Sequence, residues 1–180
     1  ALLILLAFPA DARDLRDSIS APIYLGLKAH YGFIIPHVRE LKPVSEKNIW
    51  GFQFDVSRLG ISQKAWSNCN CYYRVGLSFD YFDYRNPDEL GQSYNLILFF
   101  EPYFNFRSPW KLSFRGGMGL NYLNQVYDEE TNPGNLFYSS PISGVLLVNL
   151  ALNYSFRDHY QVNLAVNYNH ISNGGLEMPN

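Results

Sequence analysis

The chain has 180 residues, of which 47% are hydrophobic, 17% aromatic and 17% charged. This length fits one domain, and a formal net charge of −2 argues against nucleic acid as a partner, because nucleic-acid binding calls for a clustered basic surface. The 14 Tyr and 13 Phe, beside few charges, are typical of β-strands that are apolar on one face only.

The N-terminal segment resembles the end of a signal peptide. Residues 1–8 are an apolar run that is too short to span a bilayer, and Ala10-Asp11-Ala12 has the small-x-small form of a cleavage site. We therefore expect residues 1–12 to be a signal-peptide remnant and residues 13–180 to form the exported domain. A buried N-terminal strand or helix is the alternative interpretation.

Alternation of apolar and polar residues with a period of two recurs along the rest of the chain. No later stretch approaches the roughly twenty consecutive apolar residues that a membrane helix needs. The alternating segments lie at residues 23–31, 50–57, 73–81, 94–104, 111–122, 146–156 and 160–169. The pattern is least regular in 94–104, where Ile97 and Phe99 share a face with Asn95 and Glu101.

Segments of about 9 to 13 residues with aromatic ends match the strands of a transmembrane barrel. The soluble alternative, a lipocalin-like barrel or a sandwich, would turn the apolar face toward a core or a bound ligand. In a membrane barrel the charges on the other face can instead pair across a packed interior. These charged residues are Lys28, Asp55, Arg74, Asp80, Glu101, Lys111 and Arg115.

Long and short connections alternate, as expected for external loops and periplasmic turns. The long ones are residues 32–47, 85–91 and 123–141, the short ones 107–110 and 157–158, and 59–71 is an unexplained long exception. Bacterial single-chain barrels close with an even number of strands, and an unpaired edge is untenable in lipid. The prediction is an all-β, eight-stranded antiparallel transmembrane β-barrel with about seven strands in this chain and the last one missing.

His170 and Ser172 continue the apolar face of the last segment. Two residues apart on a strand, their Cα atoms lie roughly 7 Å apart, so the side chains can meet in a hydrogen bond. The imidazole could then take the serine proton, as acyl transfer requires. Asn173, Gly174 and Gly175 follow and could stabilise an oxyanion. The structural alternative is a set of polar side chains at headgroup level.

Residues 170–180, HISNGGLEMPN, resemble the active-site stretch of the PagL family of outer-membrane lipid A deacylases. The resemblance implies an eight-stranded barrel that hydrolyses the ester-linked acyl chain at position 3 of lipid A at the outer leaflet. It implies that His170 is the catalytic base and Ser172 the nucleophile. It associates Asn173, Gly175 and Asn180 with the oxyanion hole.

The resemblance also implies a third catalytic acid, a Glu downstream of Asn180. Glu177 is the only acid in residues 170–180, but it does not lie where the family places that Glu. His30 is expected to face the interior, His37 to lie in an external loop and His159 beside a turn, and none has the spacing of a metal site.

Cys69 and Cys71 are the only cysteines. A bridge between residues two apart in an extended chain is strained, and a metal site would need further ligands. We therefore expect the pair to be structural or incidental.

The sequence thus predicts an outer-membrane serine esterase that acts on the lipid A of lipopolysaccharide. Its surroundings are outer-membrane lipids, no metal or organic cofactor is expected, and a homodimer is compatible with the sequence. The rival interpretation is a non-catalytic small barrel that serves as an adhesin, an envelope scaffold or a narrow channel. A wide pore is not expected, because charged side chains would fill so small a barrel.

Overall fold

The computed structural model describes residues 2–3, 22–36, 39–61, 67, 69–157 and 160–175. The long strands are β2 (Ile23–Gly32), β3 (Ile49–Gly60), β4 (Tyr72–Asp83), β5 (Gln92–Phe104), β6 (Trp110–Leu123), β7 (Ile142–Phe156) and β8 (Tyr160–Ser172). The shorter elements are β1 (Leu2–Leu3) and the 3-10 turns η1 (Arg39–Leu41) and η2 (Pro43–Ser45). Among these residues no helix is long and apolar enough to cross a membrane.

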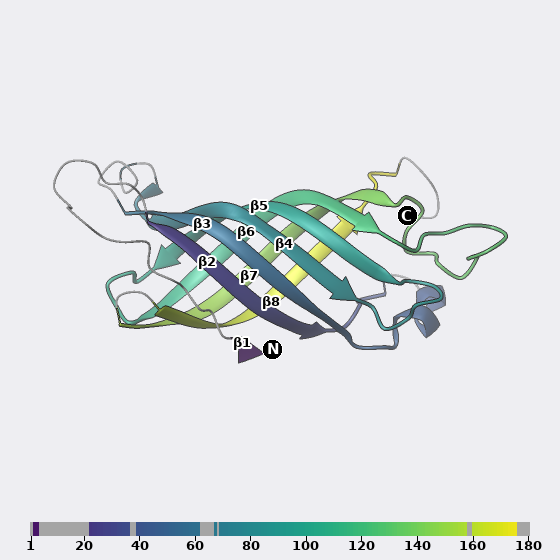
Figure 1. Ribbon diagram of the computed structural model, residues 1–180, viewed down its shortest axis with the longest axis horizontal. Helices are drawn as coiled ribbons and strands as arrows, with labels where there is room; N and C mark the ends of the chain where they lie inside the picture. Colours follow the sequence, from purple (N-terminus) through teal and green to yellow (C-terminus); the bar gives the residue numbers. More distant parts are fainter. Residues whose placement is uncertain are drawn as a thin grey trace.

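The strands form one antiparallel sheet in the order β1-β8-β7-β6-β5-β4-β3-β2, so each long strand pairs with the next one in the chain. Figure 1 shows the long strands tilted steeply and the sheet curled around a common axis. The short β1 pairs with β8 through Leu2 and Leu164 and also lies beside β2. The predicted all-β class and the seven long strands are confirmed.

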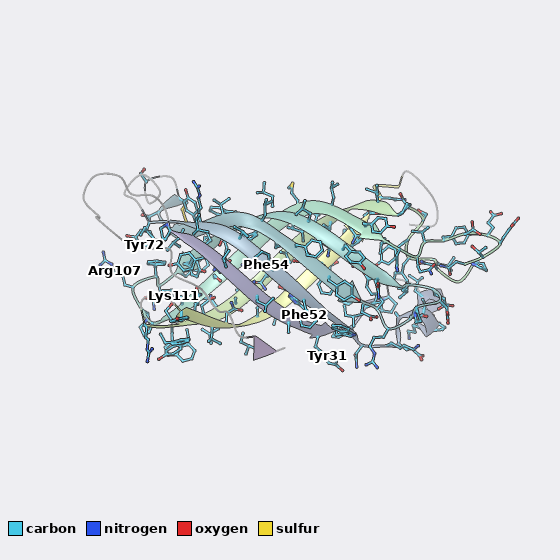
Figure 2. All side chains as sticks on the ribbon, viewed as in Figure 1. Tyr31, Phe52, Phe54, Tyr72, Arg107 and Lys111 are labelled. Atoms are coloured by element: carbon cyan, nitrogen blue, oxygen red, sulfur yellow. A yellow bond between two sulfur atoms is a disulfide. The ribbon has the colours of Figure 1, made fainter. Side chains whose placement is uncertain are left out.

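The two faces of the sheet follow the predicted alternation. Apolar residues point out of the curl, as Phe52 and Phe54 on β3 illustrate (Figure 2), while Gln53 and Asp55 between them are buried inside. The irregular segment keeps the same parity: Leu96, Leu98 and Phe100 face outward. Ile97 and Phe99 point inward because Ile97 packs against Val145 and Leu147 of β7, in a small apolar patch inside the curl.

Buried ion pairs fill the middle of the interior. Arg115 on β6 reaches Asp55 on β3 (Nη1 to Oδ2, 2.9 Å) and Glu101 on β5 (Nη2 to Oε2, 2.7 Å). Arg74 also binds Glu101 (3.0 Å), and Lys28 lies 3.5 Å from Asp55. Each of these charges is almost wholly removed from solvent, so this interior is not the apolar core or ligand cavity that the soluble alternative requires.

A second chain of polar contacts links this cluster to the edge strands. Gln53 donates from Nε2 to Asp55 (2.6 Å) and accepts at Oε1 from His30 Nε2 (2.9 Å). Asn167 Nδ2 on β8 donates to His30 Nδ1 (3.0 Å), so β2 and β8 meet across the interior. Because Oε1 only accepts and Nδ2 only donates, His30 is neutral with its proton on Nε2. The predicted inward orientation of His30 is confirmed.

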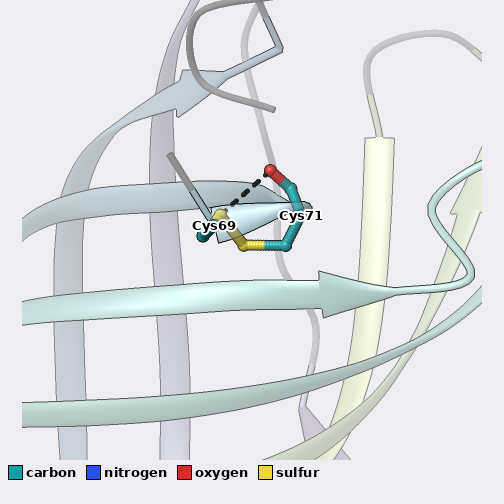
Figure 3. The surroundings of a disulfide bond; sticks show 2 residues. All are labelled: Cys69 and Cys71. Carbon is teal, nitrogen blue, oxygen red and sulfur yellow. Dashed lines mark hydrogen bonds between the residues drawn. A yellow bond between two sulfur atoms is a disulfide. The ribbon is translucent and has the colours of Figure 1, made fainter. Parts of the chain in front are cut away.

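The two ends of the curl differ in their connections. Residues 33–48, 84–91 and 124–141 join strands at one end, which we call the long-loop end; it lies on the right of Figure 1. Residues 61–71, 105–109 and 157–159 join strands at the other, the short-loop end. Segment 61–71 remains the long exception, and it carries a disulfide between Cys69 and Cys71 (Figure 3).

The Cys69–Cys71 pair is structural, one of the two expected roles, and the strain argument against a bridge does not apply. That argument assumed an extended chain, but Asn70 between them adopts a left-handed conformation (φ 54°). This turn brings the two Cα atoms to 5.1 Å, within the usual range for a disulfide. Asn tolerates that conformation better than most residues because its short polar side chain bonds locally.

Three asparagine side chains connect the long loops through hydrogen bonds. Asn132 and Asn135 both donate to the carbonyl of Glu89, at 3.0 and 2.7 Å, and Asn86 donates to the carbonyl of Val44 (3.3 Å). A small apolar core formed by Val44, Tyr84, Leu90 and Leu123 lies beneath them. Burial raises the pKa of the Tyr84 hydroxyl, which therefore stays a donor, to Ser93 (3.2 Å). The described parts of the three long loops are thus tied to one another and to the apolar core of Val44, Tyr84, Leu90 and Leu123, an arrangement that we call the cap.

We predict that Arg115→Met destabilises the barrel by roughly 3–5 kcal/mol, because the carboxylates of Asp55 and Glu101 lose their shared partner while remaining buried. Denaturant unfolding in detergent micelles, followed by circular dichroism, measures the loss. Arg107→Met, at an exposed position in the 105–109 turn, is the control and should change stability by less than about 0.5 kcal/mol. Equal stability of the two variants would contradict a structural role for the ion cluster.

Candidate active site at the end of β8

His170 and Ser172 lie at the long-loop end of β8, on its outer face. His170 is exposed and pairs across the sheet with Leu146, and Ser172 pairs with Gly144. His170 continues the outward row of Leu164, Val166 and Tyr168. The parity of the strand therefore places both side chains on the surface that carries the apolar residues, as the alternation of the sequence predicts.

The two side chains do not hydrogen bond to each other in the described structure. Ser172 Oγ accepts a hydrogen bond from the Gly174 amide at 3.0 Å. A proton transfer from Ser172 to His170 requires a direct contact between the two side chains. Such contacts are often long in ligand-free enzymes and tighten when substrate binds.

A glycine turn follows the strand and holds Asn173. Gly174 and Gly175 have φ angles of 71° and 76°, a left-handed conformation that residues with a Cβ rarely adopt. Asn173 accepts from the Gly175 amide at Oδ1 (2.9 Å) and donates from Nδ2 to Ser139 (2.7 Å). Two of the residues expected at an oxyanion hole are thus brought together, and at present they bond to each other.

Ile171 anchors this arrangement from the inside. It packs against both the loop core around Leu123 and the inner patch of Val145 and Leu147. Because Ile171 points inward, its neighbours His170 and Ser172 must point outward. The 124–141 loop then fixes the next residue through Ser139.

The surface beside Ser172 is apolar and has a gap at Gly144. A Cβ built on Gly144 would lie at an ordinary contact distance, 3.4 Å, from the Ser172 carbonyl oxygen, so a larger side chain there would occupy the space beside Ser172. Exposed apolar side chains surround the gap: Met118, Leu120, Ile142, Leu146 and Tyr168. Because Gly144 has no side chain, the surface beside Ser172 is lower there than at the apolar residues around it. We call this surface the apolar strip at Gly144, and it is suited to an alkyl chain.

Several predicted residues lie outside the described part of the chain: Asn180, Glu177, His37 and His159. Among the described residues no group of His, Cys, Asp and Glu could hold a metal ion. Sequence reasoning missed Ser139 and Gly144. Gly144 could have been noticed as a break in the outward apolar row of β7, whereas Ser139 carries no sequence signal.

A curled antiparallel sheet with a histidine and a serine on its outer, apolar face is a barrel protein with a candidate acyl-transfer site on its surface. The family model for lipid A 3-O-deacylase (PagL) matches residues 49–180. The chain belongs to this family, and the predicted family resemblance is confirmed. It is accordingly a lipid A deacylase-like hydrolase in general character. No curated protein and no solved structure matched the chain.

We predict that Gly175→Ala lowers deacylase activity at least tenfold. Its left-handed backbone (φ 76°) costs an alanine roughly 1–2 kcal/mol, which the turn can relieve by moving the amide away from Asn173. Gly32→Ala is the matched control, because a Cβ there meets only Ile49 at an ordinary 3.9 Å. Assays on lipid A in detergent with both variants measure the difference, and equal activities would contradict the importance of the turn.

Proposed function

We propose that the protein is an outer-membrane serine esterase that removes an ester-linked acyl chain, the one at position 3, from the lipid A of lipopolysaccharide. One observation carries the proposal. His170 and Ser172, in a chain of the lipid A 3-O-deacylase family, share the outward, apolar face of β8. A nucleophile on that face meets substrates that lie in the membrane.

Two rows of aromatic side chains support the membrane location. At the long-loop end ring contacts run from strand to strand, through Trp50, Tyr81, Tyr94 and Tyr122. At the short-loop end they run through Trp110, Tyr154, Phe156 and Tyr160. Aromatic girdles of this kind mark the two interfaces of membrane barrels, and exposed apolar residues such as Phe54, Leu98 and Leu150 lie between the two rows. Long loops at the cell surface would place Ser172 near the outer leaflet.

The proposed reaction begins with a direct contact between Ser172 and His170. Ser172 Oγ attacks the ester carbonyl while His170 accepts its proton, and the carbonyl oxygen becomes an oxyanion. Collapse of this intermediate expels the sugar alcohol, which takes the proton from His170 and leaves an acyl-serine. Water, deprotonated by His170, then releases the fatty acid and restores the serine.

The oxyanion would be held by donors of the glycine turn. The Asn173 amide and the Gly175 backbone N–H are the proposed groups, with Asn180 as the third residue that the family resemblance suggests. For Gly175 to act, the bond from its N–H to Asn173 Oδ1 must be exchanged for a bond to substrate. This exchange would couple substrate binding to a movement of the turn.

The interior and the loops limit where the substrate can bind. Because the ion cluster around Arg115 fills the middle of the curl, the acyl chain must lie on the outside, along the strip at Gly144. Basic side chains at the long-loop end, among them Arg39, Lys42 and Arg85, would meet the phosphates of lipid A.

We predict that the full-length protein in detergent shortens lipid A by one hydroxyacyl chain and that Ser172→Ala and His170→Ala each reduce the rate at least a thousandfold. The loss follows because removing either nucleophile or base leaves only binding and oxyanion stabilisation. Mass spectrometry of lipid A after incubation gives the product. Ser108→Ala, at the opposite end of the barrel, is the control and should retain activity.

Unchanged lipid A with the folded wild-type protein would refute the proposed activity and favour a scaffold. Loss of activity in Ser108→Ala as well would refute the assignment of Ser172 as the nucleophile.

A further inference from the structure

The short-loop end of the barrel opens into a cavity of about 450 Å³, on the far side of the ion cluster from Ser172. Arg74 lines its inner side, and the 105–109 turn together with Arg157 and Tyr160 borders its mouth. Figure 2 shows Arg107 and Lys111 at this end of the molecule. The volume falls within the range of pockets that bind small molecules.

The charges that line the cavity are all positive among the described residues. Arg74, Arg107, Lys111 and Arg157 contribute cations, and no carboxylate belongs to the described lining. Glu101 neutralises Arg74 from below. The three cations nearer the mouth form no ion pair within the described part of the chain, so the field in the mouth favours an anion.

A buried hydrogen-bond donor in the lining also lacks an acceptor. Arg74 is 2% exposed, yet its Nε has no hydrogen-bond partner among the described residues. Buried donors are nearly always paired in proteins, with protein, water or a bound ion. The Arg74 guanidinium also lies over the ring of Tyr103, at 5.4 Å from its centre, which fixes its plane.

The position of the Lys111 side chain in the lining is also fixed by contacts. Its ammonium donates to Ser155 Oγ at 2.6 Å and lies 5.5 Å above the Phe106 ring. An ammonium has three donors, so two remain for a ligand after this bond. A held lysine and a buried arginine with an unpaired donor, both lining one cavity, are what recognition of an acceptor-rich anion requires.

We propose that this cavity binds a phosphate-bearing molecule, either free phosphate or the headgroup of a phospholipid. Phosphate offers several acceptor oxygens and the negative charge that the cations of the mouth favour. Lys111, Arg157 and Arg107 contact the anion at the mouth, and the Arg74 donor completes the inner shell. The site is independent of the proposed deacylation and lies at the other end of the barrel.

Isothermal titration of the full-length protein in an uncharged detergent, at constant ionic strength, tests the proposal. The probes are inorganic phosphate and glycerol 1-phosphate. We expect one molecule to bind per chain, and the double variant Lys111→Gln with Arg157→Gln to bind at least tenfold more weakly. The matched control, Lys47→Gln with Arg58→Gln, removes two exposed cations that do not line the cavity and should bind like the wild type.

Tighter binding of glycerol 1-phosphate than of phosphate would identify a lipid headgroup as the source of the anion, and equal binding would identify free phosphate. Circular dichroism establishes that both double variants are folded, and Lys111→Arg, which keeps the charge, should retain binding if Lys111→Gln does not fold. Absence of binding by the wild-type protein, or equal weakening in the control, would overturn the proposal.

Discussion

The ion cluster around Arg115 is the interaction on which the rest of this structure depends. One guanidinium bridges Asp55 and Glu101, and strands β3, β5 and β6 are thereby tied together across the interior. Burying such charges is unfavourable unless each is paired, so their geometry fixes which face of β2, β3, β4, β5 and β6 points inward. Once that face is fixed, period-two alternation turns the apolar side chains outward. The ion cluster then leaves no room for a substrate in the middle of the curl.

The position of the candidate site follows from this constraint. Any chemistry must take place on the outer surface or at the ends, and β8 carries His170 and Ser172 outward where the strand leaves the sheet. Ile171 between them is held by the cap of long loops, which the asparagines 132 and 135 tie together. The site is thus mounted on a strand and braced by the cap, which is how a barrel can keep a reactive pair ordered at a membrane surface.

Much of the fold could be predicted from the sequence because parity is a strict rule in a strand. It assigned the faces of the seven long strands, the inward His30 and the outward pair on β8. Features that depend on contacts between distant segments could not be predicted. Ile97 and Phe99 are apolar residues on the otherwise polar inner face, and for Ile97 the reason is its contact with Val145 and Leu147. The bridge between Cys69 and Cys71 depends on the left-handed Asn70, which no alternation pattern encodes.

In the candidate site too, some features follow from the sequence of one strand and others depend on contacts between distant segments. The spacing of His170 and Ser172 predicts that they can meet, and the family match agrees with the chemistry, but the role of Ser139 arises only from the loop that brings it to Asn173. The place of Gly144 beside the candidate site likewise depends on the register of β7 and β8, which pairs Gly144 with Ser172.

Covalent labelling with a long-chain alkyl fluorophosphonate, followed by peptide mass spectrometry, tests the central claim most directly. Such a reagent phosphonylates a serine only when a base activates it, and its alkyl chain can follow the apolar strip at Gly144. The account predicts an adduct on Ser172 in the wild-type protein and none when His170 is replaced by alanine. An adduct on another serine, or deacylase activity that survives complete labelling of Ser172, would contradict it.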